Sequence, residues 1–178
     1  GTFLHFYDEK DLPFNLVFAA SAEEEISGKN GMEFLFPRLP KIDFAIVGEP
    51  TLLNIAIAEK GLMVLDCKSV GKSAHAARNE GINAIYEAIK DINWFSNYSF
   101  PSTSEETGLV NMCVTLINAG SQHNVVPSEC DFVVDVRVND KYTNQEVLEI
   151  IKSNVKCEVR ARSTRLNSSG IKEGHPIR

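Results

Sequence analysis

Cys130-Asp131-Phe132-Val133-Val134-Asp135-Val136-Arg137-Val138 is the stretch that decides the fold of this 178-residue chain. Its even-numbered positions from Phe132 onward are apolar, and charges stand between them at Asp131, Asp135 and Arg137. Because successive side chains of a strand point to opposite faces, this alternation predicts a strand that buries one face and exposes the other.

The segments on either side of this strand predict the rest of one domain, at residues 54–165. We expect further strands at 54–59, 62–69, 109–117 and 155–161, and helices at 80–96 and 144–154. The order βαββαβ predicts a ferredoxin-like α/β fold, in which a layer of helices covers an antiparallel sheet.

Two local patterns support the helices of this domain. Thr143 is a good N-cap, and Glu146 stands in the capping-box position three residues later. On the helix at 80–96, apolar residues with helical spacing predict the buried face, formed by Ile82, Ile85, Ile89 and Ile92 with Ala88 beside them.

Residues 1–53 have a different character and predict part of a second domain. The runs 14–20 and 44–47 are almost wholly apolar, and a short helix is expected between them at about 30–37. Continuous apolar strands joined by a helix form a βαβ unit of a parallel sheet. Because two strands bury too little surface to be stable alone, we expect this piece to belong to a domain to which the chain returns at 166–178.

Acidic residues follow both of these apolar runs. Glu23, Glu24 and Glu25 come after the first run, and Glu49 comes after the second. Each signal alone has a structural interpretation, since acidic residues complement a helix dipole and Glu49 before Pro50 suits a turn. Neighbouring strands lie about 4.8 Å apart, however, and carboxylates so close repel unless a divalent cation lies among them. The two signals together predict a metal site, and zinc suits carboxylate and imidazole ligands.

Three further side chains are candidates for binding or catalysis. His75 lies in a loop of small residues between a strand and a helix, where it is free to reach a ligand or simply to face solvent. Asn124 follows a Gly/Ser turn, which suits either a ligand contact or turn chemistry. Arg137 suits a bidentate bond to a carboxylate, or an ion pair with Asp135 on the same strand face.

Composition argues against several classes of function. The net charge is −6 and no run is rich in Lys or Arg, which argues against a nucleic-acid partner. The apolar runs are only as long as strands, so we expect no transmembrane span, and the first residues do not resemble a signal peptide. The four cysteines lack metal-ligand spacing and lie in or beside expected strands: Cys67, Cys113, Cys130 and Cys157. This predicts that they are free thiols in the core and that the protein is found in a reducing cytoplasm.

Five motifs resemble a family of co-catalytic zinc amidohydrolases and peptidases that includes acetylornithine deacetylase, succinyl-diaminopimelate desuccinylase, aminoacylase and glutamate carboxypeptidase. They are Ser21-Ala22-Glu23-Glu24-Glu25 with Gly28 and Gly31, Val47-Gly48-Glu49-Pro50-Thr51, Gly71-Lys72-Ser73-Ala74-His75, His123-Asn124-Val125-Val126-Pro127, and Arg137. The resemblance covers nearly the whole chain. It implies a zinc-peptidase-like catalytic domain, of which residues 1–53 are a piece, and an inserted lid domain at 54–165 that forms a homodimer.

The resemblance also implies the metal chemistry. Glu24 matches the family's general base, and Glu25 and Glu49 match zinc ligands. Two zinc ions are implied in the intact enzyme, with cobalt as the alternative metal. The family's other ligands, a His-x-Asp motif and a C-terminal histidine, have no match in this sequence, so we expect the 178-residue chain itself to be inactive.

The lid residues receive roles from the same resemblance. His75 matches a histidine that reaches the active site of the partner subunit and stabilises the oxyanion. Asn124 and Arg137 match residues that bind the substrate, with Arg137 on its carboxylate.

The implied activity is removal of an acetyl or succinyl group from an N-acyl amino acid such as N-acetylornithine, in arginine and related amino-acid biosynthesis in the cytoplasm. Two alternatives stay open: a dipeptidase or carboxypeptidase of the same family, and a dimerisation or binding module without catalysis. Nothing in these residues separates an acetyl from a succinyl substrate.

Overall fold

The computed structural model describes residues 1–23, 28–43, 45–48, 52 and 54–175, which belong to two compact units, Gly1–Pro50 and Thr51–Arg178. The domain boundaries predicted from the sequence, at 53 and 165, stay predictions. In the described part of the chain, no helix is both long and apolar enough to cross a membrane.

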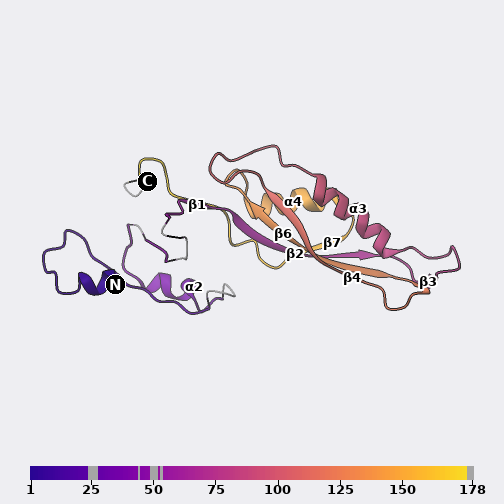
Figure 1. Ribbon diagram of the computed structural model, residues 1–178, viewed down its shortest axis with the longest axis horizontal. Coiled ribbons are helices and arrows are strands. Elements are labelled where there is room, and N and C mark those ends of the chain that lie inside the picture. Colours follow the sequence, from indigo (N-terminus) through magenta and orange to yellow (C-terminus); the bar gives the residue numbers. More distant parts are fainter. Residues whose placement is uncertain (24–27, 44, 49–51, 53, 176–178) are drawn as a thin grey trace. The chain divides into compact units, whose positions relative to one another are not determined.

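The unit Thr51–Arg178 contains a four-stranded antiparallel sheet with two helices on one face (Figure 1). In chain order its elements are β2 (Gly61–Val70), α3 (Ala84–Asn97), β4 (Asn111–Ala119), β6 (Glu129–Val138), α4 (Asn144–Asn154) and β7 (Glu158–Ala161). The strand order across the sheet is β4-β6-β2-β7, and every neighbouring pair is antiparallel. The predicted ferredoxin-like βαββαβ fold is therefore confirmed.

Two short antiparallel pairs extend this domain at opposite ends of the sheet (Figure 1). At one end β1 (Ala58–Glu59) pairs with β8 (Ser169–Gly170), so the strand expected at 54–59 is limited to two residues. At the other end β3 (Ala74–His75) pairs with β5 (Val125–Val126). We call the β3–β5 pair with its flanking residues 73–76 and 123–126 the arm.

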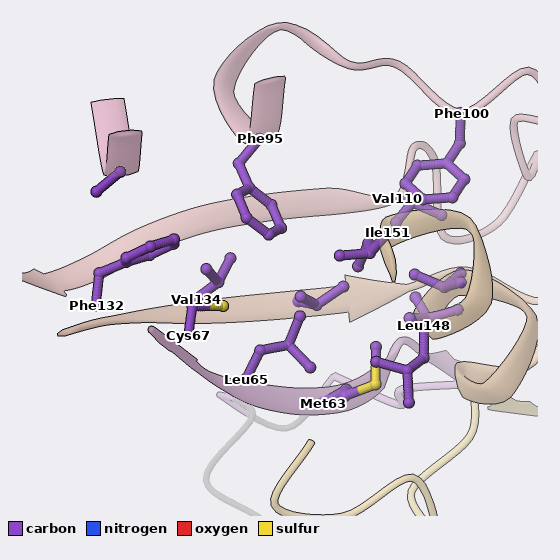
Figure 2. Packing of buried hydrophobic residues seen from close by; sticks show 14 of the residues in the cluster. Met63, Leu65, Cys67, Phe95, Phe100, Val110, Phe132, Val134, Leu148 and Ile151 are labelled. Carbon is purple, nitrogen blue, oxygen red and sulfur yellow. The ribbon is translucent and has the colours of Figure 1, made fainter. Parts of the chain in front are cut away.

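The core lies between the sheet and the two helices, as the alternation in β6 predicts. Phe132, Val134, Val136 and Val138 are at most 2% exposed, and they meet apolar residues of β2 and the helices. Figure 2 shows Phe132 and the α3 residue Phe95 on this inner side, with their ring centroids 6.1 Å apart. The opposite face of the sheet carries the charged residues of β6.

The predicted buried face of α3 is wrong in its details. The residues buried along α3 are Ala84, Ala88, Asp91 and Phe95. Ile82 and Ile89 are instead 52% and 44% exposed. The helix begins at Ala84 after the N-cap Asn83, so Ile82 precedes it. Ala88 and Ile92 do meet the core, as predicted. The small alanines let the helix approach the sheet while Phe95 fills the core, and Ile89 stays on the exposed flank.

The second helix begins as the sequence predicts. The Thr143 hydroxyl accepts a hydrogen bond from the Glu146 backbone N–H at 3.2 Å, and the Glu146 carboxylate accepts one from the Thr143 N–H at 2.7 Å. This capping box satisfies two donors at the start of α4. The Thr143 N–H also lowers the pKa of the Glu146 carboxyl.

The four cysteines are free thiols, but they do not share one environment. Cys67 and Cys130 are buried in the core, as predicted, and burial raises the pKa of the Cys130 thiol. Cys157 is half-buried, and a hydrogen bond with Cys67 together with burial raises its pKa. Cys113 is exposed because it lies on the open face of the edge strand β4, so the prediction of a core thiol is wrong there.

The unit Gly1–Pro50 contains the short helices α1 (Thr2–His5) and α2 (Met32–Leu35) and the 3₁₀ turn η1 (Phe36–Arg38). None of its described residues is in a strand, so the strand predicted at 14–20 is wrong, as is the described part of the one at 44–47. Phe18 and Ile46 are 72% and 78% exposed. A buried parallel strand requires paired neighbours and covered faces, and the described residues of this unit offer neither.

Replacement of Asn144 by alanine should destabilise the chain. The Asn144 side chain is fully buried and donates to the carbonyls of Leu62, Thr164 and Leu166 at 3.3, 3.3 and 2.8 Å. Its loss removes the hydrogen bonds that this buried amide donates to two segments of the chain, so we expect Asn144→Ala to lower the free energy of unfolding by about 1–3 kcal/mol in urea titrations.

The neighbouring exposed residue provides the control for this measurement. Gln145→Ala removes a surface bond to Glu149 and should change the free energy of unfolding by less than about 0.5 kcal/mol. Equal effects of the two substitutions would show that Asn144 does not join these segments.

Candidate functional site

Three of the six predicted site residues lie outside the described part of the structure. These are Glu24, the predicted general base, and Glu25 and Glu49, the predicted zinc ligands. Among the residues that the structure describes, no group of three or more His, Cys, Asp or Glu side chains is arranged to hold a metal ion. The metal site therefore stays a prediction.

The structure brings His75 and Asn124 together on the arm. His75 is the ladder partner of Val125, and the Ala76 N–H donates to the Asn124 carbonyl at 2.9 Å. These contacts join residues that are about fifty positions apart in the sequence. His75 is exposed and Asn124 is half-buried. The arm lies at one end of the domain (Figure 1), and both candidate residues belong to it.

Backbone contacts fix the base of the arm to the sheet. The Gly71 N–H donates to the Ser128 carbonyl at 2.7 Å, and Lys72 and Ile82 exchange two backbone hydrogen bonds of 2.8 and 3.0 Å. A Cβ at Gly71 would lie 2.1 Å from the Ile82 carbonyl oxygen, so only glycine fits there. The Gly-Lys-Ser-Ala-His motif therefore begins with a residue that lets the loop pack against the start of α3.

A local hydrogen bond selects one tautomer of His75. Its Nδ1 accepts a hydrogen bond from the Ala77 backbone N–H at 3.2 Å. Because an accepting Nδ1 carries no proton, the proton of the neutral ring is on Nε2. A neutral imidazole in this state is a hydrogen-bond donor at Nε2, which is the property that an oxyanion requires.

Arg137 lies on the open face of the sheet and pairs with a carboxylate of its own strand. Its Nε and Nη2 donate to the two oxygens of Asp135 at 2.8 and 3.2 Å. This contact is the ion pair weighed as the alternative interpretation of Arg137, and it raises the pKa of the guanidinium. The remaining guanidinium hydrogens stay available as donors.

The structure does not bring Arg137 to the arm of the same chain. Glu129 begins β6 at the arm end, and Arg137 lies near the other end of the strand. Eight residues at about 3.3 Å per residue separate them by about 26 Å. An N-acyl amino acid is too short to contact His75 and Arg137 within one chain.

Sequence reasoning missed the neighbours of Arg137. Its ladder partners are Leu62 on β2 and Asn111 on β4. The Lys60 Nζ donates to the side-chain oxygen of Asn111 and to the carbonyl of Leu109. The only local signal was the Lys60-Gly61 join between two expected strands, because the contacts themselves depend on the register of the sheet.

The two edges of the sheet differ in exposure and charge. The edge strand β4 exposes Leu116 and Ile117 at 64% and 56%, and the adjoining helix α3 exposes Tyr86 at 65%. The opposite edge, β7, has only four residues and carries Glu158 and Arg160. Short charged edges resist pairing with another chain, whereas a long apolar edge is open to it.

Residues 57–162 match the family model of the peptidase dimerisation domain. The chain is similar to succinyl-diaminopimelate desuccinylase of Orientia tsutsugamushi (strain Ikeda), with 29% identity over 159 residues, 83% of this chain and 41% of that protein. It is also similar to acetylornithine deacetylase of Myxococcus xanthus, with 28% identity over 129 residues, 68% of this chain and 34% of that protein.

Among solved structures, a tripeptidase from Staphylococcus aureus has a similar fold, with a TM-score of 0.51 and 21% identity, over 68% of this chain and 33% of that one. The chain spans about two-fifths of the length of the first curated relatives that it matches.

Proposed function

The chain belongs to the M20 peptidases through their dimerisation domain, and from that premise we propose that the whole protein is a zinc-dependent amidohydrolase that removes an acyl group from an N-acyl amino acid. The observation that carries the proposal is the arm, which holds His75 with its Nδ1 occupied and its Nε2 as a donor. The names of the relatives, a desuccinylase and a deacetylase, support an acyl group as the part removed.

We assign the catalytic chemistry to the carboxylates near the N-terminus. Glu24 takes the proton of the attacking water and passes it to the leaving amine, as a general base and acid does. Glu25 and Glu49 provide carboxylates, which suit zinc in kind but are fewer than the three protein ligands of a catalytic zinc site. Residues outside this chain complete the set. Zinc, when bound, would lower the pKa of its water to about 7 and polarise the amide carbonyl.

The lid residues stabilise and position the reacting group. His75 donates from Nε2 to the oxyanion of the tetrahedral intermediate, and Asn124, beside it on the arm, donates to the substrate. Arg137 keeps free guanidinium hydrogens beside its ion pair with Asp135, and these bind the substrate carboxylate. N-acetylornithine and N-succinyl amino acids both present the carboxylate that this assignment requires.

The separation of the arm from Arg137 leads us to propose a homodimer. About 26 Å of strand β6 lies between them, which exceeds the length of an N-acyl amino acid. A second copy resolves the conflict if the arm of one subunit serves the active site to which the other subunit contributes Arg137. The match to a dimerisation domain supports this arrangement.

We place the dimer contact at the edge strand β4 and the exposed side of α3. A two-fold axis brings the same surface of each copy together, so an apolar edge strand can pair with itself. Leu116 and Ile117 of β4 and Tyr86 of α3 then become buried. Self-pairing also satisfies the free backbone groups along the outer edge of β4. The other edge strand, β7, has only four residues and carries charges, so it offers a shorter edge for pairing.

The full-length protein should hydrolyse N-acetylornithine or N-succinylornithine, and a chelator should abolish the activity. His75→Ala should lower kcat by about 10²–10³-fold, because one oxyanion donor is lost, while zinc content and the dimer stay unchanged. Chelator-insensitive hydrolysis would defeat the metal assignment, and a normal kcat in His75→Ala would defeat the role of His75. A dimer that cleaves neither substrate would favour a binding module.

Ile117→Glu should convert the dimer to a monomer. A two-fold contact would bury two unpaired carboxylates, one from each subunit, and each costs several kcal/mol. Sedimentation velocity at equal concentrations should show about half the mass of the wild type. Arg160→Glu, on the opposite edge strand, is the matched control and should stay dimeric. If Ile117→Glu also stays dimeric, the contact lies elsewhere.

A further inference from the structure

Lys60 lies just before β2 and reaches across the sheet to the start of β4. Its Nζ donates to the Leu109 carbonyl and to the side-chain oxygen of Asn111. Asn111 is also the ladder partner of Arg137. Directly paired residues place their side chains on the same face of a sheet. Lys60 and Arg137 therefore both adjoin the Asn111 side chain on the open face.

The charges of Lys60, Arg137 and Asp135 do not balance one another. No carboxylate in the described part of the chain lies within ion-pair distance of Lys60, whereas Arg137 pairs with Asp135 at 2.8 Å. Lys68 and Arg162, elsewhere on the open face, each have a carboxylate at 2.9 and 2.7 Å. Lys60 and Arg137 with Asp135 thus carry a net charge of about +1, the complement of one carboxylate.

Donors remain available at the same place. An ammonium has three hydrogens, and Leu109 and Asn111 use two of those of Lys60. Asp135 uses the Nε hydrogen and one Nη2 hydrogen of Arg137. The side-chain oxygen of Asn111 accepts from Lys60, so its amide hydrogens also remain donors. Both cations are held by neighbours, so little side-chain freedom is lost when an anion binds.

We propose that Lys60 is a specificity-determining residue that binds the substrate carboxylate together with Arg137. This inference rests on the proposed function, because it adds a second cation to the site that Arg137 provides there. Arg137 alone is partly neutralised by Asp135, and Lys60 supplies the charge that makes the site selective for an anion. The ligand class is a monocarboxylate at the amino-acid end of an N-acyl amino acid.

A purely structural role for Lys60 makes a different prediction. In that case its two hydrogen bonds only hold the start of β4 to the start of β2, and their loss lowers stability without changing the choice of substrate. The distinguishing readout is therefore the preference for a substrate carboxylate over the corresponding carboxamide, expressed as a ratio of kcat/KM values.

The test uses the full-length protein with N-acetylornithine and N-acetylornithine amide. Lys60→Met should reduce the preference for the carboxylate by about tenfold or more, mainly through KM, since a bond to a charged group is lost. Lys60→Arg should retain most of the preference. Lys68→Met, which removes a cation paired with Glu129 on the same strand face, is the control and should leave the preference unchanged.

The outcomes separate this inference from the proposed function. An unchanged preference in Lys60→Met overturns the inference even if hydrolysis proceeds normally. If the wild type hydrolyses neither compound, the proposed function fails, and calorimetric binding of the same two compounds decides the role of Lys60 without turnover. If Lys60→Met does not fold, Lys60→Gln keeps a donor for Leu109 and Asn111 without the charge, and the same loss of preference is expected.

Discussion

The antiparallel pairing of β2 with β6 is the constraint on which the rest of the lid domain depends. Its register runs without interruption from Gly61 opposite Val138 to Val70 opposite Glu129. It places the apolar positions of both strands on one face, against α3 and α4, and the charged positions on the other. Because a slip of one residue would exchange the two faces, the buried side holds the register in place.

The same ladder keeps the two regions that carry the candidate site residues apart. At the Val70–Glu129 end the chain leaves the sheet to form the arm with His75 and Asn124. At the other end Arg137 lies with Lys60 and Asn111. The paired strands form a spacer between these regions. In the dimer that we propose, each active site combines the arm of one subunit with the cations of the other. Rigid elements position functional groups more accurately than loops do.

Local sequence patterns correctly predicted the elements that depend on residues close together in the sequence. The alternation in Cys130–Val138 gave the correct strand and faces, and Thr143 with Glu146 gave the correct start of α4. The pattern assigned Ala88 and Ile92 of α3 correctly and Ile89 wrongly, because hydrophobicity alone does not show which stripe of a helix approaches the sheet. Alanines at Ala84 and Ala88 allow the closer contact.

Other features depended on partners distant in the sequence. The apolar run at 14–20 resembles a buried strand, but a strand needs paired neighbours, which the described part of its unit does not contain. His75 and Asn124 were found as separate motifs, and only the β3–β5 pairing places them together. The contact of Lys60 with Asn111 spans 51 positions and follows from the order β4-β6-β2, which no local pattern encodes.

The claim that the arm of one subunit serves the active site of the other subunit is central to this account. It is tested most directly by mixing two inactive full-length variants, His75→Ala and Glu24→Gln, under conditions in which subunits exchange. Each mixed dimer then contains one active site with both residues intact, so the account predicts recovery of about a quarter of the wild-type activity at equal amounts. If the mixed dimers form and remain as inactive as the separate variants, His75 and Glu24 act within one subunit and the account is wrong.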